Sequence, residues 1–196
     1  MSRILFVVFI ALLAGQRSWE VRLSRRYEAQ ILAQGGREYR PDHFRVMQLL
    51  HTSWFVMMVV EVFWKRRPFK PILAIVALLL FLLGQTLRYA AIHTLRDRWT
   101  VRVMTLPGVP PVTQGVYRYL PHPNYLGVAL EIAAVPLLHT AYLTSFAFSL
   151  ANTLLLAFRI RIEEQALEAD NEYGRFFPRS AVRRLYFFPL SVESPL

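Results

Sequence analysis

The sequence predicts an all-α protein that crosses a membrane several times, with about five helices. Of its 196 residues, 55% are hydrophobic and 14% are aromatic, and the mean hydropathy is +0.31. The apolar residues gather in five runs, and charged segments lie between the runs. A soluble domain of this length is less apolar, so lipid is the solvent that suits this composition.

The first run, residues 4–14, is shorter than the roughly 20 residues that a helix needs to cross a bilayer. No small-x-small cleavage pattern follows it, so we expect a retained anchor rather than a signal peptide. Either the helix continues past Gly15, with Trp19 as an interfacial anchor, or it does not cross completely. Residues 19–45 are dense in charge and contain a Gly-Gly pair, which predicts a solvated or interfacial loop.

Four further apolar runs predict helices, at residues 46–64, 71–89, 125–138 and 141–158. A charged turn at residues 65–70 joins the first two, which we expect to form an antiparallel hairpin. Only His139 and Thr140 separate the last two, which predicts a tight C-terminal helical hairpin inside the bilayer. The hairpin is followed by a charged tail that begins as a helix.

Residues 96–121, between the two pairs of runs, are polar and rich in proline. Pro107, Pro110 and Pro111 prevent a continuous helix there. Irregular segments held by helices often carry binding residues, so this segment is the expected binding loop.

The basic charge of the chain fits a membrane better than a nucleic acid. The formal net charge is +10, from 23 Lys and Arg against 13 Asp and Glu, and the arginines bracket the apolar runs. This arrangement suits anionic lipid headgroups, whereas nucleic-acid binding needs a basic face on a soluble module. If all five runs cross, the first loop, the 96–118 loop and the tail share the cytoplasmic side, and residues 65–70 are the exception. The chain has no cysteine, and we expect neither a disulfide nor a metal site.

The most informative residues lie at the two ends of the C-terminal hairpin. His122 stands between Pro121 and Pro123 at the start of a helix, where the backbone is fixed. On the returning helix, Arg159 and Glu163 lie one turn apart on one face and near the level of His122. Carboxylates beside a loop of fixed geometry could seat a cationic cofactor. The alternative is that the prolines punctuate the chain and the charges cap a membrane helix.

These residues resemble a known family. Gly-x-Tyr at 115–117, His-Pro-x-Tyr-x-Gly at 122–127 and Arg-x-x-x-Glu-Glu at 159–164 are similar to the isoprenylcysteine carboxyl methyltransferase family and its phospholipid methyltransferase relatives. A Leu-x-x-x-Trp element at 95–99 and a Tyr-x-x-Phe segment at 173–176 extend the resemblance, which covers roughly residues 95–189. The resemblance implies a division into N-terminal transmembrane helices with a basic loop, residues 1–94, and a catalytic region, residues 95–196.

In that family these elements bind S-adenosylmethionine, and the bias of Arg and Lys predicts that the cofactor site faces the cytoplasm. The resemblance implies that the cofactor is lined by Gly115, Tyr117, His122, Pro123 and Tyr125. It further implies that Glu163 and Glu164 hold the polar end of the cofactor and that Arg159 faces the reaction centre. The family usually has Arg immediately before His-Pro, where this chain has Pro121, so Arg118 is a candidate replacement.

The acceptor is expected to be lipophilic, because the enzyme would work in a membrane. A prenylcysteine carboxylate needs no base, whereas the hydroxyl of a long-chain phenol or pyrone is mostly protonated and gains from one. Three ionisable residues, His51, Glu61 and Glu131, lie within or near apolar runs, which makes each a candidate. We expect Glu131 to act as the base with His51 paired to it across helices; the alternative is that His51 and Glu61 satisfy one another or an interfacial arginine.

Other functions remain open at this point. A phospholipid amine is a possible acceptor. The string His-Pro-Asn-Tyr-Leu-Gly also resembles NADPH-dependent membrane steroid and sterol reductases, although the Glu163–Glu164 pair favours the methyltransferase. A membrane scaffold is the non-enzymatic alternative. The sequence leaves the oligomeric state open.

Overall fold

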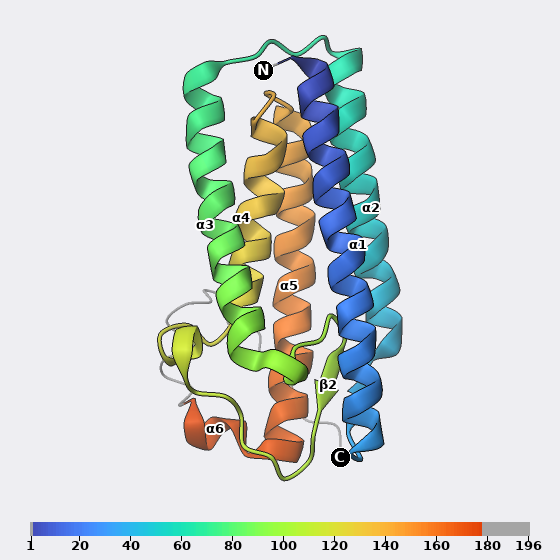
Figure 1. The fold of residues 1–196 in the computed structure, drawn as a ribbon, viewed down its shortest axis with the longest axis vertical. Helices are drawn as coiled ribbons and strands as arrows, with labels where there is room; N and C mark the ends of the chain where they lie inside the picture. Colours follow the sequence, from blue (N-terminus) through green and yellow to red (C-terminus); the bar gives the residue numbers. More distant parts are fainter. Residues whose placement is uncertain (1, 178–196) are drawn as a thin grey trace.

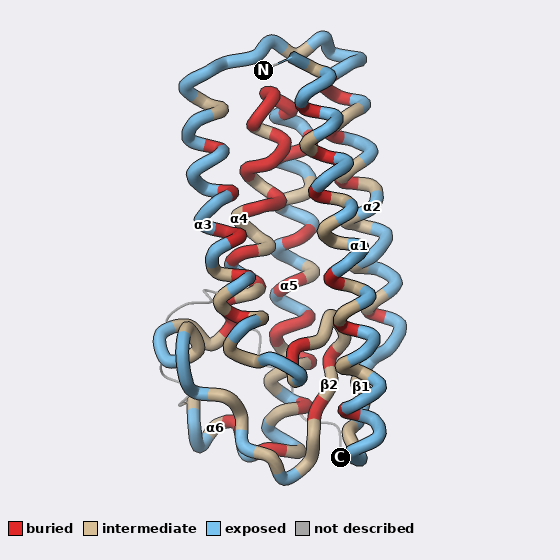
Figure 2. The backbone as a smooth tube through the Cα atoms, in the orientation of Figure 1, coloured by how far each residue is buried: buried red, intermediate tan, exposed pale blue. Residues whose placement is uncertain are grey.

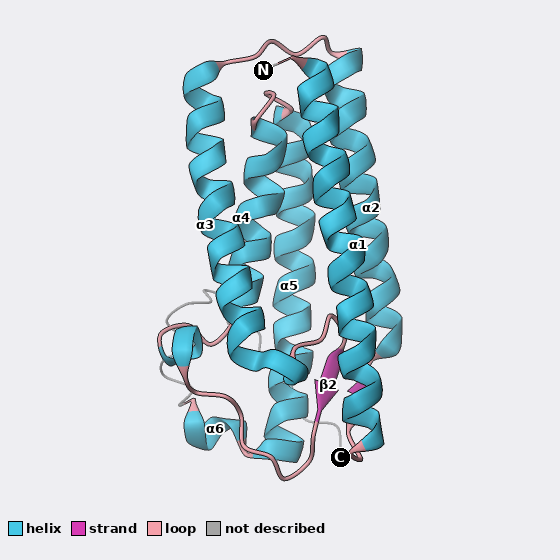
Figure 3. Ribbon diagram, viewed as in Figure 1, coloured by secondary structure: helices cyan, strands magenta, loops and turns pink. Residues whose placement is uncertain are grey.

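The computed structural model describes residues 2–177, and these form an elongated bundle of long helices (Figure 1). The long helices are α1 (Arg3–Ala33), α2 (Pro41–Trp64), α3 (Pro71–Leu95), α4 (Pro123–Leu137) and α5 (Tyr142–Asn171). Short elements gather at one end: η1 (Arg96–Arg98), η2 (Gly115–Arg118), α6 (Tyr173–Phe176) and the strands β1 (Arg37–Tyr39) and β2 (Val103–Thr105) (Figure 3). Among the described residues, four helices, α1, α2, α3 and α5, are long and apolar enough to cross a membrane. The predicted all-α membrane fold is confirmed, and the chain is an integral membrane protein.

Helix α4 lies inside the bundle. Its 15 residues extend about 22 Å, which is less than the thickness of a bilayer core. Eight of the 15 residues are buried, and Figure 2 shows that buried residues make up more of α4 than of α3. Residues 138–141 join it to α5, so the predicted C-terminal hairpin is confirmed.

The predicted hairpin of residues 46–64 and 71–89 is wrong in its packing. Helices α2 and α3 run in opposite directions, but they lie at opposite edges of the bundle and their connection crosses its end (Figure 1). Helix α3 packs on α4 instead. A Cβ atom on Gly84 would lie 2.9 Å from the Gly127 carbonyl oxygen, and one on Gly127 would lie 2.7 Å from that of Gly84. Two glycines therefore let the backbones approach, as is common between membrane helices.

The expected loop over residues 19–45 is also wrong for most of its length. Helix α1 runs past Gly15 to Ala33, which decides between the two alternatives for the first run. In the charged second half of the helix, Glu20 is bound by Arg17 and Arg88, while Arg22, Arg25 and Arg26 are exposed. The Gly-Gly pair breaks the helix as predicted, with Gly35 at φ +85°. Strand β1 then pairs antiparallel with β2, and α2 begins at once with Pro41.

Glu61 fastens the end of the bundle that lies opposite the strands. Its carboxylate accepts bonds from the backbone N–H groups of Leu143 (3.2 Å) and Thr144 (2.7 Å), from the Thr144 hydroxyl (2.8 Å) and from Arg67 (2.7 Å). These amides belong to the first turn of α5, which has no side-chain cap of its own. Glu61 therefore caps α5 and pairs with an arginine, which matches the structural alternative for this residue and not a pairing with His51.

Candidate functional site

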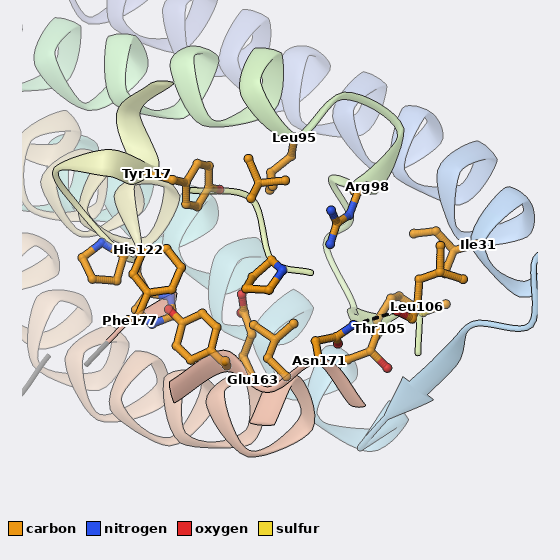
Figure 4. A pocket seen from close by; sticks show the side chains of 16 residues that line it. Ile31, Leu95, Arg98, Thr105, Leu106, Tyr117, His122, Glu163, Asn171 and Phe177 are labelled. Atoms are coloured by element: carbon orange, nitrogen blue, oxygen red, sulfur yellow. Dashed lines mark hydrogen bonds between the residues drawn. The ribbon is translucent and has the colours of Figure 1, made fainter. Parts of the chain in front are cut away.

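A pocket opens at the end of the bundle that carries the strands (Figure 4). The proline-rich segment forms one side, and α5 with α6 forms the other. Side chains from both sides line it, among them Arg98, Tyr117, His122, Glu163, Asn171 and Tyr173. The segment that the sequence marks as a binding loop thus lies against the carboxylates of α5.

His122 is held between the loop and α5. It is the residue before Pro123, the first residue of α4, and 5% of its surface is exposed. Its Nε2 lies 3.0 Å from Oε1 of Glu164, and its ring stacks on Tyr125 with 5.5 Å between the centroids. The structure therefore brings together two parts of the motif that are 42 residues apart.

Tyr125 joins Arg159 to Glu163. Its hydroxyl donates a hydrogen bond to Glu163 Oε2 and accepts one of 2.8 Å from Arg159 Nε. Arg159 is buried and also donates to the Val101 carbonyl oxygen at 2.6 Å. Arg159 and Glu163 lie on one face of α5, as predicted. Glu163 lines the pocket, and its hydrogen bond from Tyr125 holds the carboxylate in place.

The turn at residues 115–118 places Tyr117 in the wall of the pocket. Gly115 has φ +58°, and a Cβ atom there would lie 2.7 Å from Thr94 Oγ1, so a larger residue would displace the turn from the end of α3. Burial, together with the nearby charge of Glu163, raises the pKa of Tyr117 above its ordinary value. Its hydroxyl therefore stays protonated and can donate a hydrogen bond.

Two residues that the sequence analysis missed fix the loop to α5. The Asn171 side chain donates to the carbonyl oxygens of Leu106 (2.7 Å) and Val109 (2.6 Å). Asp170 accepts from the hydroxyls of Thr105 (2.5 Å) and Tyr39 (2.8 Å), which anchors the small sheet. The sequence does show two adjacent polar residues, Asp170 and Asn171, before the end of the charged helix. It does not show their partners, which are more than 60 residues away.

The structure does not support Arg118 as a replacement for the family's arginine. Arg118 is exposed and lies over the ring of Tyr119, with 5.9 Å to its centroid. Arg98 lines the pocket instead, where it donates to the Pro110 carbonyl oxygen at 3.0 Å.

Glu131 and His51 are not paired with one another. Glu131 is bound by Arg17 and lies 3.4 Å from Arg88 Nε. His51 Nδ1 lies 2.8 Å from the carbonyl oxygen of Met47 in its own helix. The predicted pairing fails because two arginines, neither of which the sequence analysis selected, compete for the carboxylate.

Arg17, Glu20, Arg88 and Glu131 form a cluster that we call the charge quartet. Glu20 accepts from Arg17 Nη1 (2.5 Å) and from Arg88, so the quartet links α1, α3 and α4. Side-chain exposure is 18% for Arg17 and 3–7% for the other three. The quartet is formally neutral, as charges in a low-dielectric interior need to be.

Comparison with known proteins agrees with these motifs. The family model for the isoprenylcysteine carboxyl methyltransferase (ICMT) family matches residues 75–169. The uncharacterized protein YpbQ of Bacillus subtilis is 36% identical over 165 residues, which cover 84% of this chain and 97% of that protein. An uncharacterized protein of Haemophilus influenzae is 26% identical over 176 residues, which cover 89% of this chain and 97% of that protein. The chain belongs to the isoprenylcysteine carboxyl methyltransferase family and is a membrane enzyme of the methyltransferase kind.

Proposed function

We propose that the protein uses S-adenosylmethionine to methylate an oxygen atom of a lipophilic acceptor, with the cofactor in the pocket between the proline-rich loop and α5. One observation carries this proposal: the loop, the His122–Glu164 pair and Glu163 meet around a single pocket at the end of a membrane bundle. The basic segments at this end support a cytoplasmic position for the pocket.

The residues of the pocket fit such a cofactor. S-adenosylmethionine carries a sulfonium and an ammonium, and when bound it supplies an activated methyl group. The Glu163 carboxylate and the ring faces of Tyr117 and Tyr173 suit these cations. Arg98 suits the carboxylate of the cofactor. Gly115, Pro123, Tyr125 and Glu164 would act by holding these residues in place, since each supports the loop or bonds to a lining side chain.

His51 is our candidate for the base. A carbonyl oxygen can only accept, so Nδ1 donates to Met47, and the neutral ring then carries a lone pair on Nε2. Within residues 2–177, no side chain bonds to Nε2. A proton leaving an acceptor hydroxyl would pass to Nε2.

Glu131 is proposed in a supporting role. Its carboxylate is already engaged by Arg17 and Arg88, and uptake of a proton would weaken both ion pairs. Its earlier assignment as the base stays a prediction that a variant can test. The acceptors that we consider are an isoprenylcysteine carboxylate and a long-chain phenol or pyrone hydroxyl.

Calorimetric titration of the purified protein in detergent tests the cofactor. We expect saturable binding of S-adenosylhomocysteine, loss of this binding in Glu163→Ala, and no saturable binding of NADPH. Glu172→Ala is the matched control, since it removes the same charge at an exposed site, where Glu172 pairs with Arg175. Binding of NADPH in place of S-adenosylhomocysteine would move the protein to the reductases, and binding of neither would support a scaffold.

The base is tested by comparing two kinds of acceptor. His51→Gln should slow methylation of a long-chain phenol by about 100-fold or more, because it removes general-base catalysis. It should leave methylation of a farnesylcysteine carboxylate within a few-fold, because that oxygen is already ionised. Equal losses on both acceptors would show that His51 has a structural role.

A further inference from the structure

Asn152 is buried in the middle of α5 without a hydrogen-bond partner. One per cent of its surface is exposed, and within residues 2–177 neither Oδ1 nor Nδ2 makes a hydrogen bond. In the hydrocarbon core of a bilayer an unpaired amide is costly, and no water is available to satisfy it. A buried polar group that the fold leaves unpaired in this way points to a partner outside the described fold.

The position of Asn152 connects it to the proposed site. It lies seven residues, or about 10 Å along the helix, from Arg159, on the same inner face of α5. Helices α2 and α5 are antiparallel: Glu61 bonds to Thr144 near one end, and the ring of His43 lies 5.3 Å from that of Phe158 near the other.

Interpolation between these two contacts places Asn152 at the level of His51. The amide and the proposed base therefore lie at one level of the bundle, and Arg159 lies below them toward the pocket.

A second unpaired group lies on the facing helix. His43 is 8% exposed, and its Nε2 has no hydrogen-bond partner in residues 2–177. Its ring lies beside that of Phe158, the residue before Arg159, so this group is on the side of α2 that faces α5. The charge quartet does not share this property, since its charges are paired with one another. Within residues 2–177, Asn152 and His43 are two buried groups without hydrogen-bond partners that lie where α2 faces α5, whereas other such atoms, among them Trp99 Nε1 and Asn124 Oδ1, belong to other elements.

We infer that Asn152 binds the headgroup of the methyl acceptor at a polar group other than the oxygen that is methylated. This inference rests on the proposed function. The Asn152 amide offers an NH2 group that donates and a carbonyl oxygen that accepts, so it suits a headgroup that carries a second hydroxyl or carbonyl next to the reacting oxygen. About 10 Å of helix between Asn152 and Arg159 leaves room for one ring between the amide and the long arginine side chain. The tail of the acceptor then lies among the apolar residues of the bundle or in lipid.

Two alkyl acceptors that differ by one hydroxyl test this inference: 5-pentadecylresorcinol and 3-pentadecylphenol. The wild type should methylate the resorcinol with a kcat/KM about tenfold higher, the worth of one good hydrogen bond. In Asn152→Leu the ratio should fall to about one after division by two, the statistical factor for the two equivalent hydroxyls of the resorcinol. Thr153→Val, which removes a hydroxyl on the exposed side of the same helix turn, should keep the wild-type ratio.

Thermal unfolding without acceptor adds a readout that separates binding from structure. Asn152→Leu should raise the melting temperature by a few degrees, since it removes an unpaired amide. A lower melting temperature would mean that the amide has a structural partner and would overturn the inference.

Equal rates for the two acceptors in the wild type would also overturn the inference, as would methylation of neither by protein that binds S-adenosylhomocysteine. In both cases the cofactor assignment stands. Failure to bind S-adenosylhomocysteine is the separate result that removes the proposed function itself.

Discussion

Replacement of Glu131 by Gln tests the charge quartet most directly. The change keeps the volume of the side chain but leaves Arg17, Arg88 and Glu20 with a net positive charge among side chains that are 3–18% exposed. Removal of one partner from a buried ion pair costs about 3–5 kcal/mol, and Gln keeps one acceptor, so we expect about 3 kcal/mol. For a chain of this size, this corresponds to a melting temperature lower by about 6–12 °C.

The double variant Glu131→Gln/Arg88→Met is the control, because it restores neutrality and leaves the Arg17–Glu20 pair intact. It should recover more than half of the decrease in melting temperature. Thermal unfolding in detergent is monitored by tryptophan fluorescence. Methylation measured in parallel decides the role of Glu131: a base would leave both variants inactive, whereas an ion-pair partner would let the double variant recover activity. A change below 2 °C in the single variant, or strictly additive losses in the double variant, would refute the reasoning.

Two further predictions concern packing and pH. Gly127→Ala places a Cβ atom 2.6 Å from Arg88 Cγ and 2.7 Å from the Gly84 carbonyl oxygen, so it should destabilise the protein by about 1–3 kcal/mol. Gly15→Ala has nothing within 4 Å of the new atom and should be neutral or stabilising; equal melting temperatures for the two variants would contradict the close approach. The raised pKa of Tyr117 means that its contribution to stability is present below its unfolded value of about 10 and is lost as pH rises beyond it. Tyr117→Phe should therefore flatten the fall in melting temperature above pH 10, and an unchanged slope would show that another group causes it.

Hydropathy predicted the helices well but not their neighbours. The runs at 46–64 and 71–89 are apolar on most sides, so their sequences do not reveal which face meets protein and which meets lipid. The close approach at Gly84 shows that α3 packs against α4 and not against α2. The density of charge and the Gly-Gly pair predicted a loop over residues 19–45. The sequence does not reveal the partners of these charges, since Glu20 is bound by Arg88, 68 residues away.

The candidate site was more predictable where its residues lie in a motif. His122, Glu163 and Glu164 come from short patterns with chemical meaning, and the fold brings them to one pocket. Asp170 and Asn171 carry no such pattern, because they act on backbone and hydroxyl groups of the loop. Asn152 is an ordinary polar residue in the sequence, and only its burial makes it conspicuous.

The shortness of α4 has a consequence for how the protein enters the membrane. Fifteen residues that include Glu131 are too few and too polar to remain in lipid as a separate span. Synthesis delivers Arg17 and Arg88 to the bilayer before Glu131 leaves the ribosome. The α4–α5 hairpin is therefore expected to enter the membrane by packing against α1 and α3, which already present Arg17 and Arg88 to Glu131.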